Sequence, residues 1–466
     1  MAGEGIASVR EAGSARSCVA LTLLLWLVVS LGAQAANPAY PLKISVNKRY
    51  FVDQNNVPFL YHGDTPWSLF KNLTKEEAEQ YLENRRQKGF NAVIVNILDT
   101  EPYPNGGDVN FRDVRNRYGE GPFKPAGDFS SPNEKYFAHI DWVIEKAAEK
   151  GILVVLAPAY LGCCMDGWIE RLQANGPTKC RDYGRYLGNR YKDFDNIMWM
   201  HGGDRLPGCA TCEIREIALG IRDNDKRHFH TAHWAPEHSA LDMYPNETWL
   251  DFNTTYTYKL VHAMLWRDYS RVPIAPFILV ESHYENEHYG RTDPRDWPTT
   301  QWVRRQAYWA ILCGAAGQSM GNNPIWFFGT GWQAAMDSPG SMSMVHLKAL
   351  FTSRAWYSLV PDQDHTVVTA GHGDSRSLDY LTAARTEDGG TVIAYLPTRR
   401  TVTIDMSKIS GEQAKAWWFD PRIGKATSVG EFATRGPKEF TPPADDDWVL
   451  VLDDASKERS IPGVPK

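Results

Sequence analysis

Two acidic residues each end an apolar stretch that has the character of a buried strand. The segment NIMWMHGGD (Asn196–Asp204) ends in Asp204, and PFILVE (Pro276–Glu281) ends in Glu281. Strands buried on both faces are nearly continuous apolar runs, and carboxylates are rarely buried without a partner. Each acid therefore indicates a functional site, a helix cap, or an ion pair with a neighbouring arginine such as Arg205.

Two carboxylates that face each other suit the hydrolysis of a glycosidic bond. One carboxyl group, kept protonated by its surroundings, gives a proton to the leaving oxygen, while the other attacks the anomeric carbon or activates a water molecule. A separation of about 5–5.5 Å corresponds to retention of configuration through a covalent glycosyl intermediate. We predict this geometry for Asp204 and Glu281, with Asp64 as the main rival for a catalytic role.

Other polar and aromatic residues end the neighbouring predicted strands and are expected around the same site. The side chains expected to bind hydroxyl groups are His62, Asp64, Asn96, His201 and His283. Those expected to stack on sugar rings are Trp67, Trp234, Tyr256 and Trp326, because Trp and Tyr combine a flat apolar face with a polar edge. His233 also ends a strand but receives no role.

Metal, cofactor and serine-nucleophile chemistry find little support. Four histidines lie close together, at positions 228, 230, 233 and 238, but no HExxH motif is present. Strand alternation would place His228 and His230 on one face and His233 on the other. No GxSxG segment occurs either. We expect no metal and no cofactor.

Net charge and composition narrow the possible partners without identifying one. The 466 residues carry a formal net charge of −6, which gives no reason to expect nucleic acid or an anionic membrane surface. The 17 Trp and 21 Tyr residues suit sugar binding as well as ordinary core packing. A carbohydrate is the expected partner, and the oligomeric state is left open.

Strand and helix patterns alternate eight times between about residues 58 and 360. The eight predicted strands lie at 58–61, 90–98, 152–160, 196–204, 228–236, 250–258, 276–281 and 316–328. A helix pattern follows each strand except the fifth, and the first helix opens with the capping-box pair Thr74 and Glu77. This predicts an α/β fold, a (β/α)8 TIM barrel, with its site at the carboxyl ends of the strands. A doubly wound sheet is the alternative, but no GxGxxG or GxxxxGK[ST] motif is present.

The two ends of the chain have different patterns. Arg10 and Arg16 precede the apolar run Val19–Leu31, and Ala33-Gln34-Ala35 follows. This predicts a signal peptide over 1–35, and hence a secreted or periplasmic protein that leaves the membrane after cleavage. The barrel is expected over 36–360. Short alternating segments over 361–455 predict a β-sandwich, followed by a tail at 456–466.

Six cysteines remain after the predicted cleavage site. They are Cys163, Cys164, Cys180, Cys209, Cys212 and Cys313. An even number in an exported protein favours disulfides, although Cys209-Ala-Thr-Cys212 also resembles half of a zinc site. Cys313 is expected to be a buried thiol.

Several segments together resemble the apiosidase-like glycoside hydrolases, glycoside hydrolase family 140. They are HGDTPWSLF (62–70), the helix and strand over 74–98, MWMHGGD (198–204) and FILVESHYE (277–285), and the resemblance covers about residues 43–356. The segment AKAWWFDPRIGKA (414–426) resembles a collagen-binding-type β-domain that is often fused behind this family. Pro66 replaces a more common alanine, and the cysteine-rich insertions also depart from the family pattern.

The resemblance implies a (β/α)8 barrel with an aspartate acid/base and a glutamate nucleophile, which correspond to Asp204 and Glu281. It also implies removal of apiose, a branched pentose, from a pectic polysaccharide. A retaining, exo-acting hydrolase of a terminal furanose or pentose is therefore expected. Activity on arabinofuranose or galactofuranose, and a non-catalytic protein that binds polysaccharide or matrix, are the alternatives.

Overall fold

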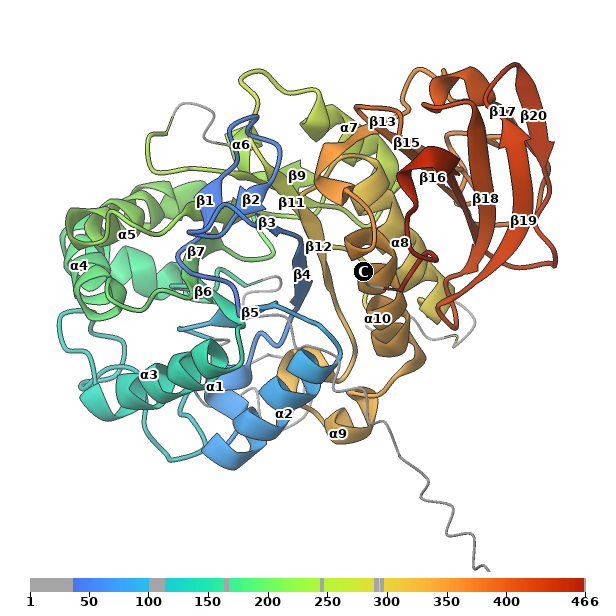
Figure 1. Ribbon diagram of the computed structural model, residues 1–466. Coiled ribbons are helices and arrows are strands. Elements are labelled where there is room, and N and C mark those ends of the chain that lie inside the picture. The colour runs from blue at the N-terminus through green and yellow to red at the C-terminus, as the bar shows by residue number, and fades with distance from the viewer. Residues whose placement is uncertain are drawn as a thin grey trace, which may run out of the picture. The chain divides into compact units, whose positions relative to one another are not determined.

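Eight parallel strands form a nearly closed barrel surrounded by helices (Figure 1). The computed structural model describes residues 37–99, 114–162, 167–243, 247–288, 293 and 297–464. The barrel strands are β4 (Tyr61–Asp64), β5 (Ala92–Asn96), β6 (Leu153–Ala157), β7 (Ile197–Gly202), β8 (His230–His233), β10 (Asn253–Tyr256), β11 (Phe277–Glu281) and β12 (Gly317–Met320). The pairing of β4 with β12 joins the first strand to the last, which confirms the predicted barrel.

The barrel opens only between β8 and β10, where the regular strand pairing stops. The antiparallel strand β9 (His238–Ser239) pairs with β10 there. Hydrogen bonds still cross the gap; for example, the Asp251 amide donates to the carbonyl of His230 at 2.9 Å, and the Thr231 hydroxyl donates to the carbonyl of Phe252, also at 2.9 Å.

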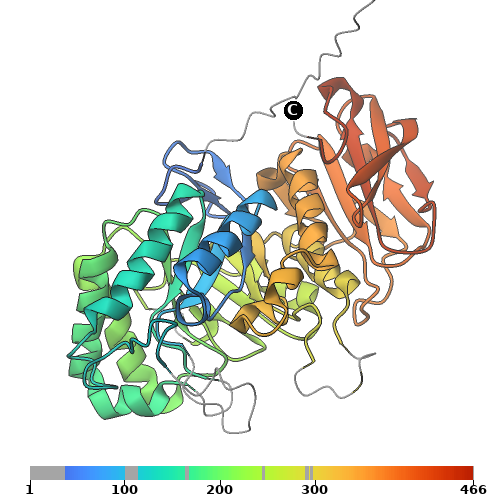
Figure 2. The same cartoon turned by 90° about the horizontal axis from the view of Figure 1, so that it is seen from below.

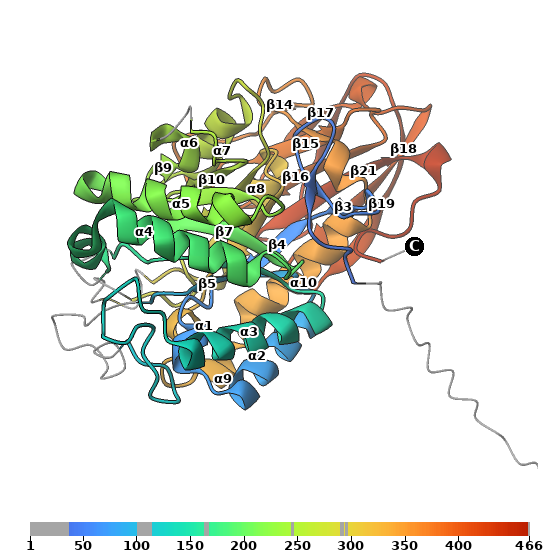
Figure 3. The same ribbon diagram turned by 90° about the vertical axis from the view of Figure 1, so that its left-hand side faces the viewer.

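Helices cover the outside of the barrel, as the view in Figure 3 shows for α1 to α5. They are α1 (Leu69–Asn72), α2 (Lys75–Gln87), α3 (Glu134–Glu149), α4 (Ile169–Tyr191), α5 (Thr211–Asn224), α6 (Ala240–Met243), α7 (Val261–Tyr269), α8 (Thr300–Leu312), α9 (Trp332–Ala335) and α10 (Pro339–Thr352). The predicted capping box is present at α2, where Thr74 and Glu77 each accept a hydrogen bond from the other's backbone amide. None of the helices in the described ranges is long and apolar enough to span a bilayer.

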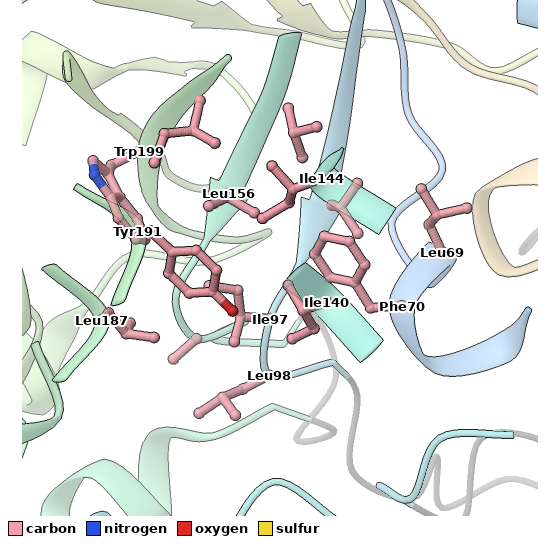
Figure 4. Close-up of a cluster of buried hydrophobic side chains, with 14 of the residues drawn as sticks. Leu69, Phe70, Ile97, Leu98, Ile140, Ile144, Leu156, Leu187, Tyr191 and Trp199 are labelled. Atoms are coloured by element: carbon pink, nitrogen blue, oxygen red, sulfur yellow. The ribbon is translucent and has the colours of Figure 1, made fainter. Parts of the chain in front are cut away.

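Strand alternation sorts the barrel side chains into an inner and an outer set. Ala92, Ile94, Val155 and Met200 belong to the inner core. Their neighbours along the same strands face the helices; Figure 4 shows part of this outer core, including Leu156 and Trp199 beside Ile140, Ile144 and Tyr191. Within a regular strand, a side chain therefore reaches the barrel opening only from a position on the inner face, which we call a position of inward parity.

A short antiparallel sheet, β1 (Lys43–Ile44), β2 (Phe51–Val52) and β3 (Pro58–Phe59), precedes the barrel. Two antiparallel sheets follow it, which confirms the predicted all-β region. The larger contains β13 (Leu359–Pro361), β15 (Thr382–Thr386), β16 (Thr391–Leu396), β21 (Trp448–Asp454), β18 (Gln413–Asp420) and β19 (Lys425–Ala433). The smaller contains β14 (Val368–Ala370), β17 (Val402–Asp405) and β20 (Pro437–Phe440).

The central strands β16 and β21 of the larger C-terminal sheet are buried on both faces. One face packs on the smaller sheet, and the other packs on barrel helices, with Ile393 and Val451 in the same core cluster as Leu312 and Leu347 (Figure 2). Arg304 of α8 binds Asp447 through Nε at 2.9 Å and Nη2 at 2.7 Å, and both side chains are buried. The C-terminal sheets therefore share a core with the barrel.

The cysteines and the C-terminal segment differ from expectation. Cys180, Cys209, Cys212 and Cys313 are free thiols, and Cys313 is buried as expected. Cys163 and Cys164, like the predicted signal peptide, lie outside the described residues. The segment expected as a tail is attached to the end of α10, because the carbonyl of Ser460 accepts a hydrogen bond from Arg354 at 2.9 Å.

Candidate active site

A tight glycine turn places Asp204 at the opening of the barrel. Gly202, the last residue of β7, and Gly203 have φ values of 104° and 138°, and Asp204 itself has φ of 53°. A Cβ on Gly202 would lie 2.1 Å from the carbonyl oxygen of His233, and one on Gly203 would lie 2.4 Å from the ring of Tyr160. Only glycine fits these two positions. The HGGD segment is therefore shaped to present the Asp204 carboxylate.

A change in strand register turns Glu281 into the barrel. Phe277 and Leu279 face the helices, so strict alternation would send Glu281 outward as well. However, Thr255 pairs with Leu279 and the next residue, Tyr256, pairs with Glu281, which leaves Val280 unopposed. Such a bulge resets the alternation of the strand that carries it. Glu281 therefore faces the same interior as Tyr256.

The two carboxylates meet through a network of tyrosine hydroxyls. Asp204 accepts hydrogen bonds from Tyr160 at 2.7 Å and from Tyr256 at 3.0 Å. Glu281 accepts one from Tyr258 at 3.1 Å, and the hydroxyls of Tyr256 and Tyr258 are 3.1 Å apart. One carboxylate oxygen of Asp204 and one of Glu281 lie within 4.8 Å of each other. Asp204 forms no ion pair with Arg205 in the described part of the chain, so that alternative is excluded there.

His233 connects the backbone of Asp204 to the side chain of Glu281. Its Nε2 lies 2.8 Å from Oε2 of Glu281, and its Nδ1 accepts a hydrogen bond from the Asp204 amide at 3.4 Å. Because Nδ1 acts as an acceptor, a neutral imidazole carries its proton on Nε2 and donates it to Glu281. The edge of Trp67 contacts this imidazole at a ring distance of 5.4 Å, and Tyr256 lies against it at 4.5 Å.

Electrostatics keep a proton in this group up to near-neutral pH. Burial and the negative charge of Asp204 raise the pKa of Glu281 to about 7, while the hydrogen bond and charge of His233 act in the opposite direction. Burial lowers the pKa of His233, but its hydrogen bond to Glu281 and the two carboxylate charges outweigh burial and raise it. Burial also raises the pKa of Tyr256 and Tyr258 well above the usual value, so both remain donors.

The same three side chains could in principle hold a divalent cation. One potential ligand atom each from Asp204, His233 and Glu281 lie within 4.8 Å of one another. However, every carboxylate oxygen of Asp204 and Glu281 already accepts a hydrogen bond, from Tyr160, Tyr256, Tyr258 or His233. Protein groups therefore already satisfy the four carboxylate oxygens. The arrangement suits a proton bound between the two acids better than a metal cation.

Two of the expected hydroxyl-binding residues, His62 and Asp64, face away from the opening. Both have outward parity on β4. The His62 ring stacks on Phe90 at 4.9 Å. Asp64 accepts a hydrogen bond from Tyr81 at 2.6 Å and lies 3.2 Å from Arg85, with both charged groups fully buried. The assignment of these residues to substrate is therefore corrected, and Asp64 is no longer a rival catalytic acid.

His201 and Trp234 also lie outside the opening. His201 has outward parity on β7, and its Nε2 is 3.1 Å from Nδ1 of His230 in a fully buried pair. Trp234 is 1% exposed, and its indole donates to the carbonyl of Ala240 at 3.0 Å. It supports Gly202 from behind, so it offers no face to a sugar.

Four other expected residues remain near the opening. Trp67 donates to the hydroxyl of Tyr284 at 2.7 Å, and Asn96 has inward parity at the end of β5. His283 binds the carbonyl of Tyr258 at 2.9 Å, so it supports Tyr258. Trp326 is half-buried against the inner core, in the turn Ile325–Phe327. Trp67 and Trp326 are thus available as walls of the site.

Sequence reasoning missed Tyr160, His233, Tyr258 and Tyr284. His233 was visible as a strand end, but its hydrogen bond to Glu281 was not expected. Tyr258 lies two residues after Tyr256, so the same alternation that placed Tyr256 could have placed it. Tyr160 and Tyr284 follow their strands in loops, where parity gives no information.

A family model described as "Apiosidase-like, catalytic domain" matches residues 45–358. The chain belongs to the apiosidase-like glycoside hydrolases. A second model, described as "Putative collagen-binding domain of a collagenase", matches residues 360–453. The comparison with curated proteins finds no match.

Solved structures agree with this family. A structure titled "Glycoside hydrolase" is 28% identical with a TM-score of 0.78, and the match covers 90% of this chain and 98% of the other. A glycoside hydrolase family 5 protein from Bacteroides vulgatus has the same identity and TM-score, with 90% and 94% covered. A second glycoside hydrolase from that organism, 14% identical with a TM-score of 0.65 over 90% and 83%, shares the fold. The apiosidase-like protein is thus a glycoside hydrolase.

Proposed function

We propose that this glycoside hydrolase is exo-acting and retaining, and that it removes a terminal furanose or pentose such as apiose from a plant-type polysaccharide side chain. The close approach of Asp204 and Glu281 within one barrel opening carries the proposal. Retaining enzymes hold their two carboxyl groups about 5–5.5 Å apart, whereas inverting enzymes keep them about 6.5–9.5 Å apart to admit an attacking water, so this close approach favours retention.

Depth in the opening assigns the two roles. Glu281 is only 5% exposed, whereas Asp204 is half-buried nearer the solvent. A nucleophile attacks the anomeric carbon from inside the site, and the acid/base must reach the leaving group and then the incoming water. Glu281 is therefore the nucleophile. Asp204 protonates the departing oxygen, and then takes a proton from the water that releases the sugar from Glu281.

His233 is a positioning residue in this scheme. Its Nε2–H fixes Oε2 of Glu281, while Tyr258 fixes Oε1, so both oxygens of the nucleophile are held before the sugar arrives. Since His233 also lowers the pKa of Glu281, it favours the ionised carboxylate that must attack. Such preorganised hydrogen bonds contribute because they need no rearrangement during the reaction.

Aryl glycosides of apiose, arabinofuranose and galactofuranose test the activity and the sugar together. We expect turnover of at least one, and a loss of at least about 10²-fold in both Asp204→Asn and Glu281→Gln. Unchanged turnover in either variant would refute the role of that residue. Failure on all three sugars would refute the furanosidase proposal.

Azide distinguishes the two roles. In Asp204→Ala, azide intercepts the covalent intermediate on Glu281, so the glycosyl azide keeps the configuration of the substrate. In Glu281→Ala, azide attacks the substrate directly, and the product has the opposite configuration. The reverse pattern would exchange the roles, and inversion in the wild-type enzyme would exclude the covalent intermediate.

We also propose that the protein is exported and matures by cleavage after Ala35. The charged residues and apolar run before Ala33 support this, as they form the pattern of a signal peptide. N-terminal sequencing of the protein recovered from outside the cytoplasm should begin at Ala36. A mature chain that starts at Met1 would contradict it.

A further inference from the structure

A crevice of about 260 Å³ lies at the end of the barrel opposite to the active site. Ile274 and Ala315 precede β11 and β12, and Tyr269 and Ile311 lie at the ends of helices α7 and α8. These positions belong to the amino-terminal ends of the barrel strands. Residues before the barrel, the segment around Trp356–Val360, and Glu387 in the turn after β15 also line it. The proposed reaction gives no role to this crevice.

Aromatic rings form one wall of the crevice. The ring of Tyr50 lies 5.8 Å from Trp356 and 5.7 Å from Tyr357, at angles of 71° and 46°. Tyr357 is 41% exposed, and the neighbouring Val360 is also exposed. Flat aromatic faces that remain open to solvent are suited to the apolar C–H face of a sugar ring.

Polar groups without protein partners surround this wall. The guanidinium of Arg49 lies 3.9 Å from the ring centre of Tyr269, and its Nη1 donates to the Tyr269 carbonyl at 2.6 Å. Its other N–H groups have no acceptor among the described residues. The side-chain NH2 of Asn47 and the exposed carboxylate of Glu387 likewise have no partner in the described part of the chain. The crevice therefore offers both donors and an acceptor.

We propose that this crevice is a second carbohydrate site, which binds an internal stretch of a neutral glycan chain. A sugar hydroxyl donates and accepts, so it can use Arg49, Asn47 and Glu387 together while its ring lies on Tyr357. The opposite charges of Arg49 and Glu387 give no preference for an anionic chain. The proposal rests on the polysaccharide substrate proposed above, and it gives an exo-acting enzyme a way to hold the chain away from its cleaved end.

Affinity electrophoresis tests the site in the full-length protein. Native gels contain linear arabinan or galactan as neutral probes, or rhamnogalacturonan-II as an anionic probe. The test variants are Arg49→Ala/Tyr357→Ala and Glu387→Ala. The control Arg376→Ala/Leu378→Ala removes an arginine and an exposed apolar side chain from another surface, where Leu378 is also 41% exposed and the Arg376 side chain is 86% exposed.

We expect at least one neutral glycan to retard the wild-type protein. Both test variants should raise the apparent dissociation constant by at least about fivefold, while the control stays within twofold of wild type. Glu387→Ala keeps the result decisive if loss of Arg49 unfolds the protein, because the Glu387 carboxylate has no partner among the described residues whose loss would affect folding.

Three results would overturn the site: no retardation by either neutral glycan, equal retardation of the wild type and Glu387→Ala, or retardation by the anionic probe alone. Wild-type turnover of the aryl glycosides is measured in parallel. Retardation without turnover would overturn the proposed activity and leave the second carbohydrate site standing. Turnover without retardation would overturn the second site and leave the proposed activity standing.

Discussion

The ends of β4 and β7 have nearly the same sequence, but their aspartate side chains point to opposite sides of the barrel wall. His62-Gly63-Asp64 ends β4 and His201-Gly202-Gly203-Asp204 ends β7. Both histidines face the outer helices. Asp64 follows two residues later, so it keeps the same parity and forms a buried pair with Arg85. Asp204 follows one residue further on, after a left-handed turn, and enters the barrel opening. One additional glycine separates an acid buried against a helix from an acid that faces the barrel opening.

The largest expected effect concerns the two aspartates as a pair. Asp204→Asn should lower kcat/KM for the preferred aryl glycoside by about 10²–10⁴-fold, because it removes the group that transfers the proton. Its midpoint of thermal unfolding should stay near that of the wild type, as Asp204 is half-buried and its carboxylate binds tyrosine hydroxyls. Kinetics and calorimetry on the same sample check both statements. A large loss of stability in Asp204→Asn without loss of activity would show that Asp204, like Asp64, has a structural role.

Asp64→Asn should show the opposite behaviour. Removal of one charge from a fully buried pair leaves Arg85 uncompensated, which typically costs about 3 kcal/mol of the free energy of unfolding. The variant that remains folded should keep kcat near the wild-type value, since Asp64 faces the helices. Urea unfolding followed by tryptophan fluorescence measures the loss. Full stability combined with lost turnover would return Asp64 to the active site.

Gly203→Ala should damage the glycine turn itself. The new Cβ would meet the ring of Tyr160 at 2.4 Å, and that ring carries the hydroxyl that binds Asp204. A displacement of the acid by about 1 Å costs about 10²-fold in rate, so kcat should fall by that order. Gly208→Ala is the matched control, because Gly208 also has a positive φ, of 50°, but a Cβ added there would meet no described atom within 4 Å. Equal losses of kcat in both variants would show that backbone strain alone, and not the contact with Tyr160, causes the effect.

His233→Ala should have the smallest effect, and it should appear in the pH profile. In the wild type, kcat/KM should fall as the pH rises through about 7, because the carboxyl pair then loses its shared proton. Since His233 lowers the pKa of Glu281, its removal should move this alkaline limb to higher pH, with a loss in kcat of about tenfold. His233→Gln, which keeps an N–H donor, should recover part of kcat. An unchanged alkaline limb in His233→Ala would refute the coupling.

The sequence alone was sufficient for the eight-strand barrel, the β-sheets after it, and the pair of acids at two strand ends. Each of these is written in local patterns: apolar runs, helix caps such as Thr74 with Glu77, and glycines before Asp204. The ring of expected binding residues was less successful. His62, Asp64, His201 and Trp234 were selected because they end strands, although the end of a strand does not say which face a side chain occupies.

The direction of each side chain was decided by tertiary structure. Glu281 has outward parity along its own strand, and only the bulge at Val280, formed against β10, turns it toward Asp204. A bulge is a property of two paired strands, so neither strand contains it alone. The two acids at the strand ends were therefore legible in the chain, whereas their meeting in the barrel opening depended on register between segments that are distant in sequence.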